Sequence, residues 1–241
     1  MLTGFEGFFE HSQEDASTIL SAATQWVREN KENRFFLYIH LLDTHTPYRP
    51  DPVMMERFCE EPPTGYSEQM TYSLLHGHLK GELEDTTKLD EFVEHYSNLY
   101  DAEIATLDAK LSTFFANLSA MGLDDRTVIA ITSDHGEACG DHGLILKGCR
   151  FYEGLIRVPL MISWPGGPRG EVVSHPVEHI DLGRTLLDMS GFQADDFPGR
   201  SLLGAIDGSA PAEPRFSISA NGKCAAVIHE GWQLTLNLRM H

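Results

Sequence analysis

The segment VIAITSDHGEACGDHGLILKG, residues 128–148, indicates the fold of this chain more clearly than any other segment. Its first residues, Val128 to Thr132, have the length and β-branched composition of a buried strand. Asp134 and His135 follow almost directly. Because ligands bind at the carboxyl ends of strands in open α/β sheets, this order of residues predicts a strand that ends at a functional site.

Helical and strand-like patterns alternate on both sides of this segment. Ser12 has the character of an N-cap, and apolar residues at helical spacing follow it. The run RFFLYIHLL, residues 34–42, is almost continuously apolar, which is typical of a strand buried on both faces in a parallel sheet. The further elements that the sequence predicts are a helix at 13–30, an insertion with short helical pieces at 51–86, a helix from Thr87 to Gly122, a strand at 158–163 and a helix at 179–190 that ends at Gly191.

The pattern changes near the C-terminus, in the stretch FSISANGKCAAVIHEGWQLTLNL. Asn221-Gly222 separates two strand-like runs and predicts a two-residue type I′ hairpin. A second turn at Glu230-Gly231 predicts a third strand. We therefore expect an α/β layer sandwich over residues 1–205, and the start of a small antiparallel β subdomain over residues 206–241.

Composition excludes several classes of partner and site. The chain has 241 residues with 36 acids and 18 bases, and its net charge of −18 disfavours binding to nucleic acid or an anionic membrane. The four cysteines form no C-x-x-C pair, so neither a zinc knuckle nor a dense disulfide framework is expected. No apolar run is long enough to cross a bilayer, and the first residues contain no signal-peptide core, so the compartment is left open.

Four residues are candidates for a metal and oxyanion site. Asp134 offers a hard oxygen and His135 an imidazole nitrogen, which is half of a divalent metal site. Lys147, in a glycine-containing loop, suits an oxyanion such as sulfate or phosphate. His45 follows the predicted strand at 34–42 and suits proton donation or an oxyanion contact. Each of these residues alone also suits a structural role in a turn, a loop hydrogen bond or a solvated surface.

Other ionisable residues have simpler interpretations. Asp141-His142 is left out of the predicted site, because holding the loop in place is a sufficient role for this pair. Glu103 lies mid-helix and suits packing between helix and sheet, Arg157 suits an ion pair with a carboxylate, and Asp181 suits a helix cap.

Taken together, several segments resemble the sulfatases of the alkaline phosphatase superfamily. The resemblance covers most of residues 13–205, and its segments follow the order of that family. They are FFLYIHLLDTHTPYRP (35–50), YDAEIATLDAKL (100–111), VIAITSDHGEACGDHG (128–143), LKGCRFYEGLIRVPLMISWPG (146–166) and HPVEHIDLGRTLLDMSGF (175–192).

The resemblance implies an alkaline-phosphatase-like three-layer αβα sandwich and a role for each candidate. Asp134 and His135 would bind one divalent cation, calcium in the first place, with manganese, magnesium and zinc as alternatives. Lys147 would contact the sulfate and the leaving-group oxygen, and His45 would contact the sulfate and act as the general acid.

One departure from the family is important. Sulfatases convert the Cys or Ser of a C-x-P/A-x-R type motif into a formylglycine nucleophile, and none of the four cysteines here lies in such a motif. The paired aspartates that complete the family's metal site are also absent. The chain therefore resembles the C-terminal portion of a sulfatase, and we expect these residues alone to be inactive and to bind metal weakly.

Three functions follow as hypotheses. The first is hydrolysis of a sulfate ester of a small molecule or glycan. The second is hydrolysis of a phosphodiester or phosphonate monoester by the same superfamily. The third is a non-catalytic remnant, or one part of a split protein that binds a separate N-terminal half through an exposed sheet edge.

Overall fold

The structure is a computed structural model, and it describes residues 7, 15–145, 151–193, 196–206, 208, 213–219 and 222–237. The chain forms two compact units. The first contains residues 1–124 and 139–145, and the second contains residues 125–138 and 146–241. The boundary expected at residue 205, between the α/β sandwich and the β subdomain, does not coincide with this division and stays a prediction.

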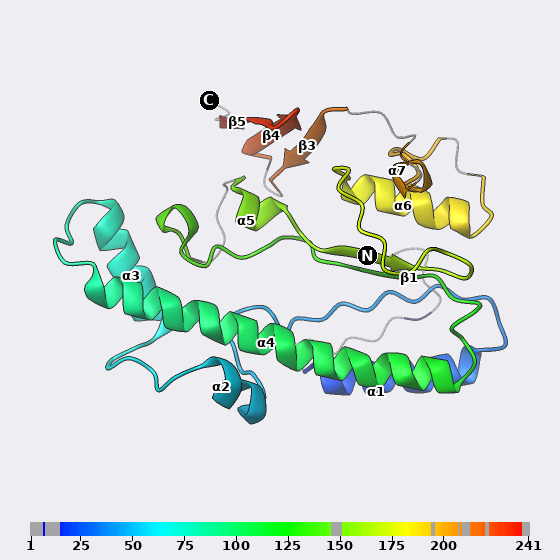
Figure 1. The fold of residues 1–241 in the computed structure, drawn as a ribbon, viewed down its shortest axis with the longest axis horizontal. Helices are drawn as coiled ribbons and strands as arrows, with labels where there is room; N and C mark the ends of the chain where they lie inside the picture. Colours follow the sequence, from blue (N-terminus) through cyan, green and yellow to red (C-terminus); the bar gives the residue numbers. More distant parts are fainter. Residues whose placement is uncertain are drawn as a thin grey trace. The chain divides into compact units, whose positions relative to one another are not determined.

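A long helix, α4 (Thr87–Ala120), organises the first unit. Its apolar residues recur at helical spacing, and Phe92 and Tyr96 on its inner face are completely buried. Gly122 follows the helix with a φ of +71°, as expected for a residue that ends a helix in the left-handed region. Three shorter helices contact α4 and are visible along it in Figure 1: α1 (Ala16–Asn30), α2 (Pro52–Phe58) and α3 (Glu68–Leu79).

The predicted first helix is confirmed, with a correction at its start. Asp15, not Ser12, is the N-cap of α1, and its side chain accepts a hydrogen bond from the backbone N–H of Thr18. This bond and the charge of Lys110 lower the pKa of Asp15. Ser12 itself lies outside the described residues.

The prediction of a doubly buried strand at residues 34–42 is wrong. The segment is extended, but none of the described strands pairs with it. Its side chains alternate in exposure, and Phe36 and Tyr38 are 66% and 65% exposed. A continuous apolar run predicts burial on both faces, whereas in this structure only every second side chain is partly covered.

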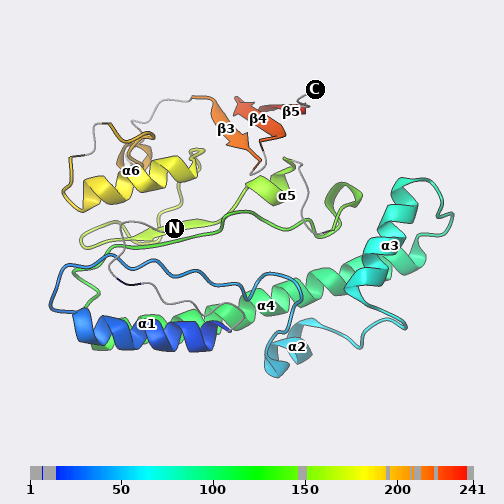
Figure 2. The same ribbon diagram turned by 180° about the vertical axis from the view of Figure 1, so that it is seen from behind.

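The loop that follows this segment is fixed by side chains of α4. The blue segment that leads into it runs along α4 in both views (Figures 1 and 2). Buried Tyr48 donates a hydrogen bond from its hydroxyl to that of Tyr96, over 3.1 Å. Three further bonds fix the loop: Lys110 Nζ to Asp43 Oδ1 at 2.7 Å, Arg49 N–H to Glu103 Oε2 at 2.7 Å, and Asp51 N–H to Thr106 Oγ1 at 3.0 Å. The predicted structural role of Glu103 agrees with this arrangement.

Glu103 should make stability depend on pH. Burial raises the pKa of Glu103, despite the hydrogen bond from Arg49, so the folded state binds this proton more tightly than the unfolded state. Its contribution is therefore complete below the usual carboxyl pKa and is lost as pH rises through the folded-state value. Glu103→Gln keeps the acceptor oxygen for Arg49 but cannot ionise. Relative to the unmodified chain, the variant should become more stable as pH rises from acidic to neutral, measured by urea unfolding. A pH-independent difference would contradict this.

In the second unit, both predicted strands are present, but they pair antiparallel. β1 (Ile129–Thr132) lies beside β2 (Leu160–Ser163), with Ile129 opposite Ser163. The helices among the described residues of this unit are α5 (Glu153–Ile156), α6 (His179–Met189) and α7 (Leu203–Ile206). Gly191, just after α6, has a φ of +76°, which confirms the predicted end of that helix.

The predicted C-terminal meander is confirmed. It consists of β3 (Arg215–Ile218), β4 (Cys224–His229) and β5 (Trp232–Asn237), all antiparallel. Glu230 and Gly231 both have positive φ between paired residues His229 and Trp232, as a type I′ turn requires. The first hairpin differs from the prediction, because the bond from Ser219 N–H to the Cys224 carbonyl leaves a four-residue loop between them rather than a two-residue turn. Asn221 lies outside the described residues.

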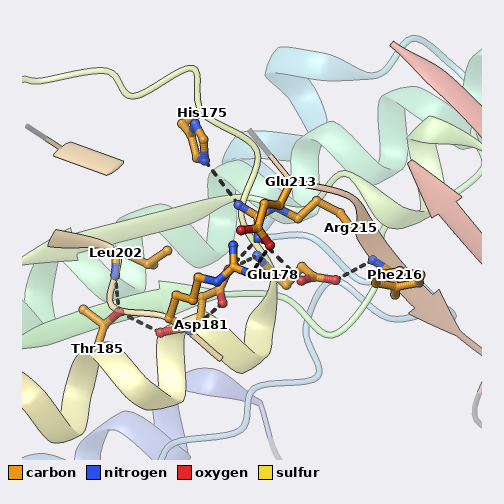
Figure 3. Close-up of polar contacts among 9 residues, drawn as sticks. His175, Glu178, Asp181, Thr185, Leu202, Glu213, Arg215 and Phe216 are labelled. Carbon is orange, nitrogen blue, oxygen red and sulfur yellow. Dashed lines mark hydrogen bonds and ion pairs between the residues drawn. The ribbon is translucent and has the colours of Figure 1, made fainter. Parts of the chain in front are cut away.

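The start of α6 connects the meander to the rest of the second unit (Figure 3). Asp181 and Glu178 form a capping box, so the prediction of Asp181 as a helix cap is confirmed. Buried Asp181 also accepts a hydrogen bond from the Arg200 backbone N–H at 2.9 Å and lies 3.5 Å from the Arg215 guanidinium. Glu178 accepts the backbone N–H of Phe216. Two carboxylates therefore cap a helix and at the same time attach β3 to it.

No helix within the described ranges is long and apolar enough to cross a membrane.

Candidate functional site

The predicted metal ligands lie in a tight turn directly after β1. The Ser133 hydroxyl donates to the His135 carbonyl at 2.7 Å, and the His135 backbone N–H donates to Asp134 Oδ1 at 3.0 Å. Both side chains are accessible, with 74% of the Asp134 side chain and 40% of the His135 side chain exposed. The turn therefore presents a carboxylate and an imidazole together at the carboxyl end of the strand.

The orientation of His135 suits metal binding. Its Nδ1 lies 2.8 Å from the Gly136 carbonyl, and only a protonated Nδ1 can donate to that oxygen. The neutral ring then has its lone pair on Nε2, which lies 3.6 Å from Asp134 Oδ1. A backbone hydrogen bond that fixes the tautomer in this way is usual for histidines that bind metals.

The two residues supply only part of a coordination shell. Among the described residues, no group of three or more His, Cys, Asp or Glu side chains is arranged to hold a metal ion. Calcium takes six to eight oxygen ligands, so further ligands must join Asp134 and His135 in a stable site. A carboxylate and an imidazole are suitable ligands for a divalent cation, but two ligands are too few for a stable site.

Gly136 was not selected from the sequence, but it determines the shape of this turn. Its N–H donates to the Leu155 carbonyl at 2.8 Å, which ties the turn to α5. A Cβ atom placed on Gly136 would lie 2.0 Å from the Gly154 carbonyl oxygen. The glycine in the sequence SDHG was the available signal, because close approach of two backbones requires a residue without a side chain.

We expect Gly136→Ala to destabilise the second unit by about 2 kcal/mol or more, since the clash is with backbone that cannot rotate away. Urea unfolding measures this change. Gly77→Ala in α3 is the control for an added Cβ without a clash, because no atom lies within 4 Å of that position and its φ is not in the left-handed region. The control should cost no stability, and a Gly136→Ala variant that also costs none would contradict the steric role of Gly136.

His45 lies in the first unit, on the loop held by α4. Its side chain is exposed, and its Nδ1 lies 2.6 Å from the Thr46 carbonyl oxygen. With Nδ1 as the donor, Nε2 is left for a substrate or a proton. The proximity of His45 to Asp134 and His135 stays a prediction, and Lys147 lies outside the described residues.

The structural interpretations of Arg157 and of the pair Asp141-His142 agree with where these residues lie. Arg157 forms an ion pair with Glu153 at 2.6 Å, as expected, although both side chains are exposed. Asp141 and His142 form a short 3-10 helix, η1 (Asp141–Gly143). Val93 lies against the preceding Gly140, where an added Cβ would be 2.6 Å from its Cγ1, so η1 is held to the first unit.

Comparison with known proteins gives the family. The sulfatase family model matches residues 6–192. Arylsulfatase K of Danio rerio is 30% identical over 244 aligned positions, which cover 87% of this chain and 44% of that protein. Choline-sulfatase of Rhizobium meliloti (strain 1021) is 32% identical over 149 positions, which cover 59% of this chain and 29% of that protein. The chain belongs to the sulfatase family.

A solved structure supports the fold. The phosphonate monoester hydrolase of Agrobacterium radiobacter superposes with a TM-score of 0.62 at 23% identity, over 91% of this chain and 54% of that one. This similarity confirms the alkaline-phosphatase-like fold that the sequence predicts. The chain spans less than half the length of the two curated relatives. Sulfatases generally use a divalent metal ion, with which the chemistry of Asp134 and His135 agrees.

Proposed function

We propose that this chain is part of a sulfuric ester hydrolase, in which Asp134 and His135 bind one divalent metal ion. The main support is the turn after β1 in a chain of the sulfatase family, where a carboxylate oxygen and a correctly oriented imidazole nitrogen lie 3.6 Å apart. A bound divalent cation supplies Lewis-acid chemistry, which withdraws charge from a sulfate oxygen. Calcium is the first choice, and manganese, magnesium and zinc are the alternatives for an imidazole-containing site.

In this proposal, His45 and Lys147 act on the oxygen of the leaving group. As the bond between sulfur and the ester oxygen breaks, that oxygen gains negative charge and needs a proton. His45 can donate this proton from Nε2 when its ring carries a second proton, because Nδ1–H is already bonded to its own loop. Lys147 contacts the sulfate and the leaving oxygen with a positive charge.

The nucleophile in this proposal comes from residues outside these 241. The sequence contains no motif of the C-x-P/A-x-R type, so no residue here is a candidate for conversion to formylglycine. The chain alone is accordingly proposed to be inactive. The curated relatives are named for choline sulfate and aryl sulfate esters, which supports a sulfate ester of a small molecule or glycan as the substrate class.

The test uses the longest reading frame that contains this chain, compared with residues 1–241 alone. The expected result is turnover of an aryl sulfate by the longer protein only, with lower rates on a matched phosphodiester and phosphonate monoester. Equal turnover by residues 1–241 would show that the nucleophile lies within them. Preference for the phosphorus esters would replace the proposal by its superfamily alternative.

A further inference from the structure

An acidic cleft in the first unit has no part in the proposed chemistry. It lies between the C-terminal end of α2 with the loop that follows and the first half of α4, and its volume is about 430 Å³. This volume lies within the range of sites that bind small organic molecules. Five glutamates line it: Glu56, Glu60, Glu61, Glu91 and Glu94.

These carboxylates have no positive partner in the described part of the chain. None of the five forms an ion pair with a described residue. Arg57 is the single cation among the lining residues, and its guanidinium lies over the Phe58 ring at 5.5 Å. Like charges gathered in one concave surface raise the local concentration of cations.

His95 provides an independent indication of a ligand. It lines the same cleft and is only 8% exposed, yet no described residue hydrogen-bonds to its ring. Its close neighbour is the ring of Tyr66, edge-on at 4.5 Å between centroids, which satisfies neither nitrogen. The nitrogens of His95 are not among the fully buried polar atoms that lack a hydrogen-bond partner. The imidazole can therefore gain a partner through the cleft.

The chemistry of His95 fits a donor of hydrogen bonds. Burial lowers the pKa of His95, so its ring is neutral near neutral pH and offers one nitrogen as an acceptor. An ammonium group has N–H donors for this nitrogen and a positive charge for the surrounding carboxylates. Metal ions are a poorer fit, because no three candidate ligands converge in the described part of the chain.

We propose that this cleft binds a linear aliphatic polyamine, with one ammonium group at His95 and the others along the glutamates. Charges spaced along a flexible chain match carboxylates that are spread over a cleft, whereas a compact ion matches only one or two. Phe58 and Pro63 line the cleft as well and provide apolar contact for the methylene groups between the amines. The proposal is independent of the sulfatase function.

Calorimetric titration of residues 1–241 with spermidine tests this. Replacing three lining acids together (Glu60→Gln, Glu61→Gln and Glu94→Gln) should weaken binding by about tenfold or more, because each removed charge contributes modestly. The matched control removes three exposed acids elsewhere (Glu32→Gln, Asp125→Asn and Glu171→Gln) and should change affinity by less than about twofold. Equal weakening in both variants would overturn the proposal in favour of attraction by net charge.

A second measurement locates the ligand. The imidazole proton resonances of His95 should shift on addition of spermidine and saturate together with the calorimetric signal. Magnesium chloride at the same ionic strength should leave them in place. A His95 resonance that does not respond to spermidine, or responds equally to magnesium, would overturn the proposal.

Discussion

Lys110→Met is expected to lower the free energy of unfolding by about 3 to 5 kcal/mol, because it leaves a buried carboxylate without its cation. The Asp43 side chain is only 3% exposed, and its Oδ1 lies 2.7 Å from Lys110 Nζ. Its only other hydrogen bond among the described residues is from the Ala16 N–H at 3.1 Å, while Oδ2 is buried without a partner. Methionine fills similar volume, so the effect should come from the charge.

The raised pKa of Lys110 supports the expected loss of unfolding free energy. Burial acts to lower the pKa of Lys110, but the hydrogen bond and the charge of Asp43 outweigh it and hold this pKa above the usual value. The lysine therefore remains charged at every pH at which the protein would normally be studied. Asp15 lies 3.5 Å from the same ammonium but is more exposed, so it adds little.

Two comparisons isolate the buried pair by urea unfolding. Adding Asp43→Asn to Lys110→Met should recover part of the loss, since a neutral amide costs less to bury than a carboxylate. Arg157→Met removes an ion pair of similar length whose side chains are 81% and 73% exposed, and should cost less than about 1 kcal/mol. If Lys110→Met and Arg157→Met cost the same, burial of Asp43 does not determine the effect.

The sequence predicted the elements whose pattern is local. Helix α4 repeats its apolar positions over many turns, and the Glu230-Gly231 turn has residues suited to positive φ, so both could be located without tertiary information. Local patterns did not predict whether neighbouring strands pair parallel or antiparallel. β1 and β2 are apolar runs of the same kind, and nothing in either run states that they lie antiparallel.

The error at residues 34–42 has a physical explanation. Hydrophobicity indicates which side chains favour burial, but burial also needs a neighbouring element to cover them. In this chain the segment is extended and its alternate side chains, Phe36 and Tyr38 among them, stay exposed. The sequence described the preference of the segment correctly, whereas its surroundings depend on other parts of the fold.

In the candidate site, too, the features that are local in the sequence were predictable, and those that depend on distant segments were not. Asp134 and His135 are adjacent in sequence, so their shared turn was predictable from the strand before them. The glycine that follows them indicates a close backbone approach, but the sequence does not show that its partner is the carbonyl of Gly154, eighteen residues further along the chain. The acidic cleft was missed for the same reason, since its glutamates come from two separate segments.

If a longer protein that contains this chain turns over an aryl sulfate as proposed, His135→Ala should lower its kcat/KM by about 10³-fold or more, and Asp134→Asn should have a comparable effect. Loss of the cation removes several kcal/mol of charge stabilisation in the transition state, and each 1.4 kcal/mol or so corresponds to about tenfold in rate. Treatment with a chelator should have the same consequence in the unmodified protein. Adding calcium back should restore its activity but not that of either variant.

A second Asp-His pair in the same chain provides the control. Asp141 and His142 lie in η1, close in sequence to the first pair and also followed by a glycine, but not after a strand. Asp141→Asn and His142→Ala should keep kcat/KM within about tenfold of the unmodified protein, since neither is proposed to bind the metal. Calcium content, measured on purified protein, should fall only in the variants of Asp134 and His135. If the Asp141 and His142 variants lose calcium and activity equally, the metal ligands have been assigned to the wrong pair.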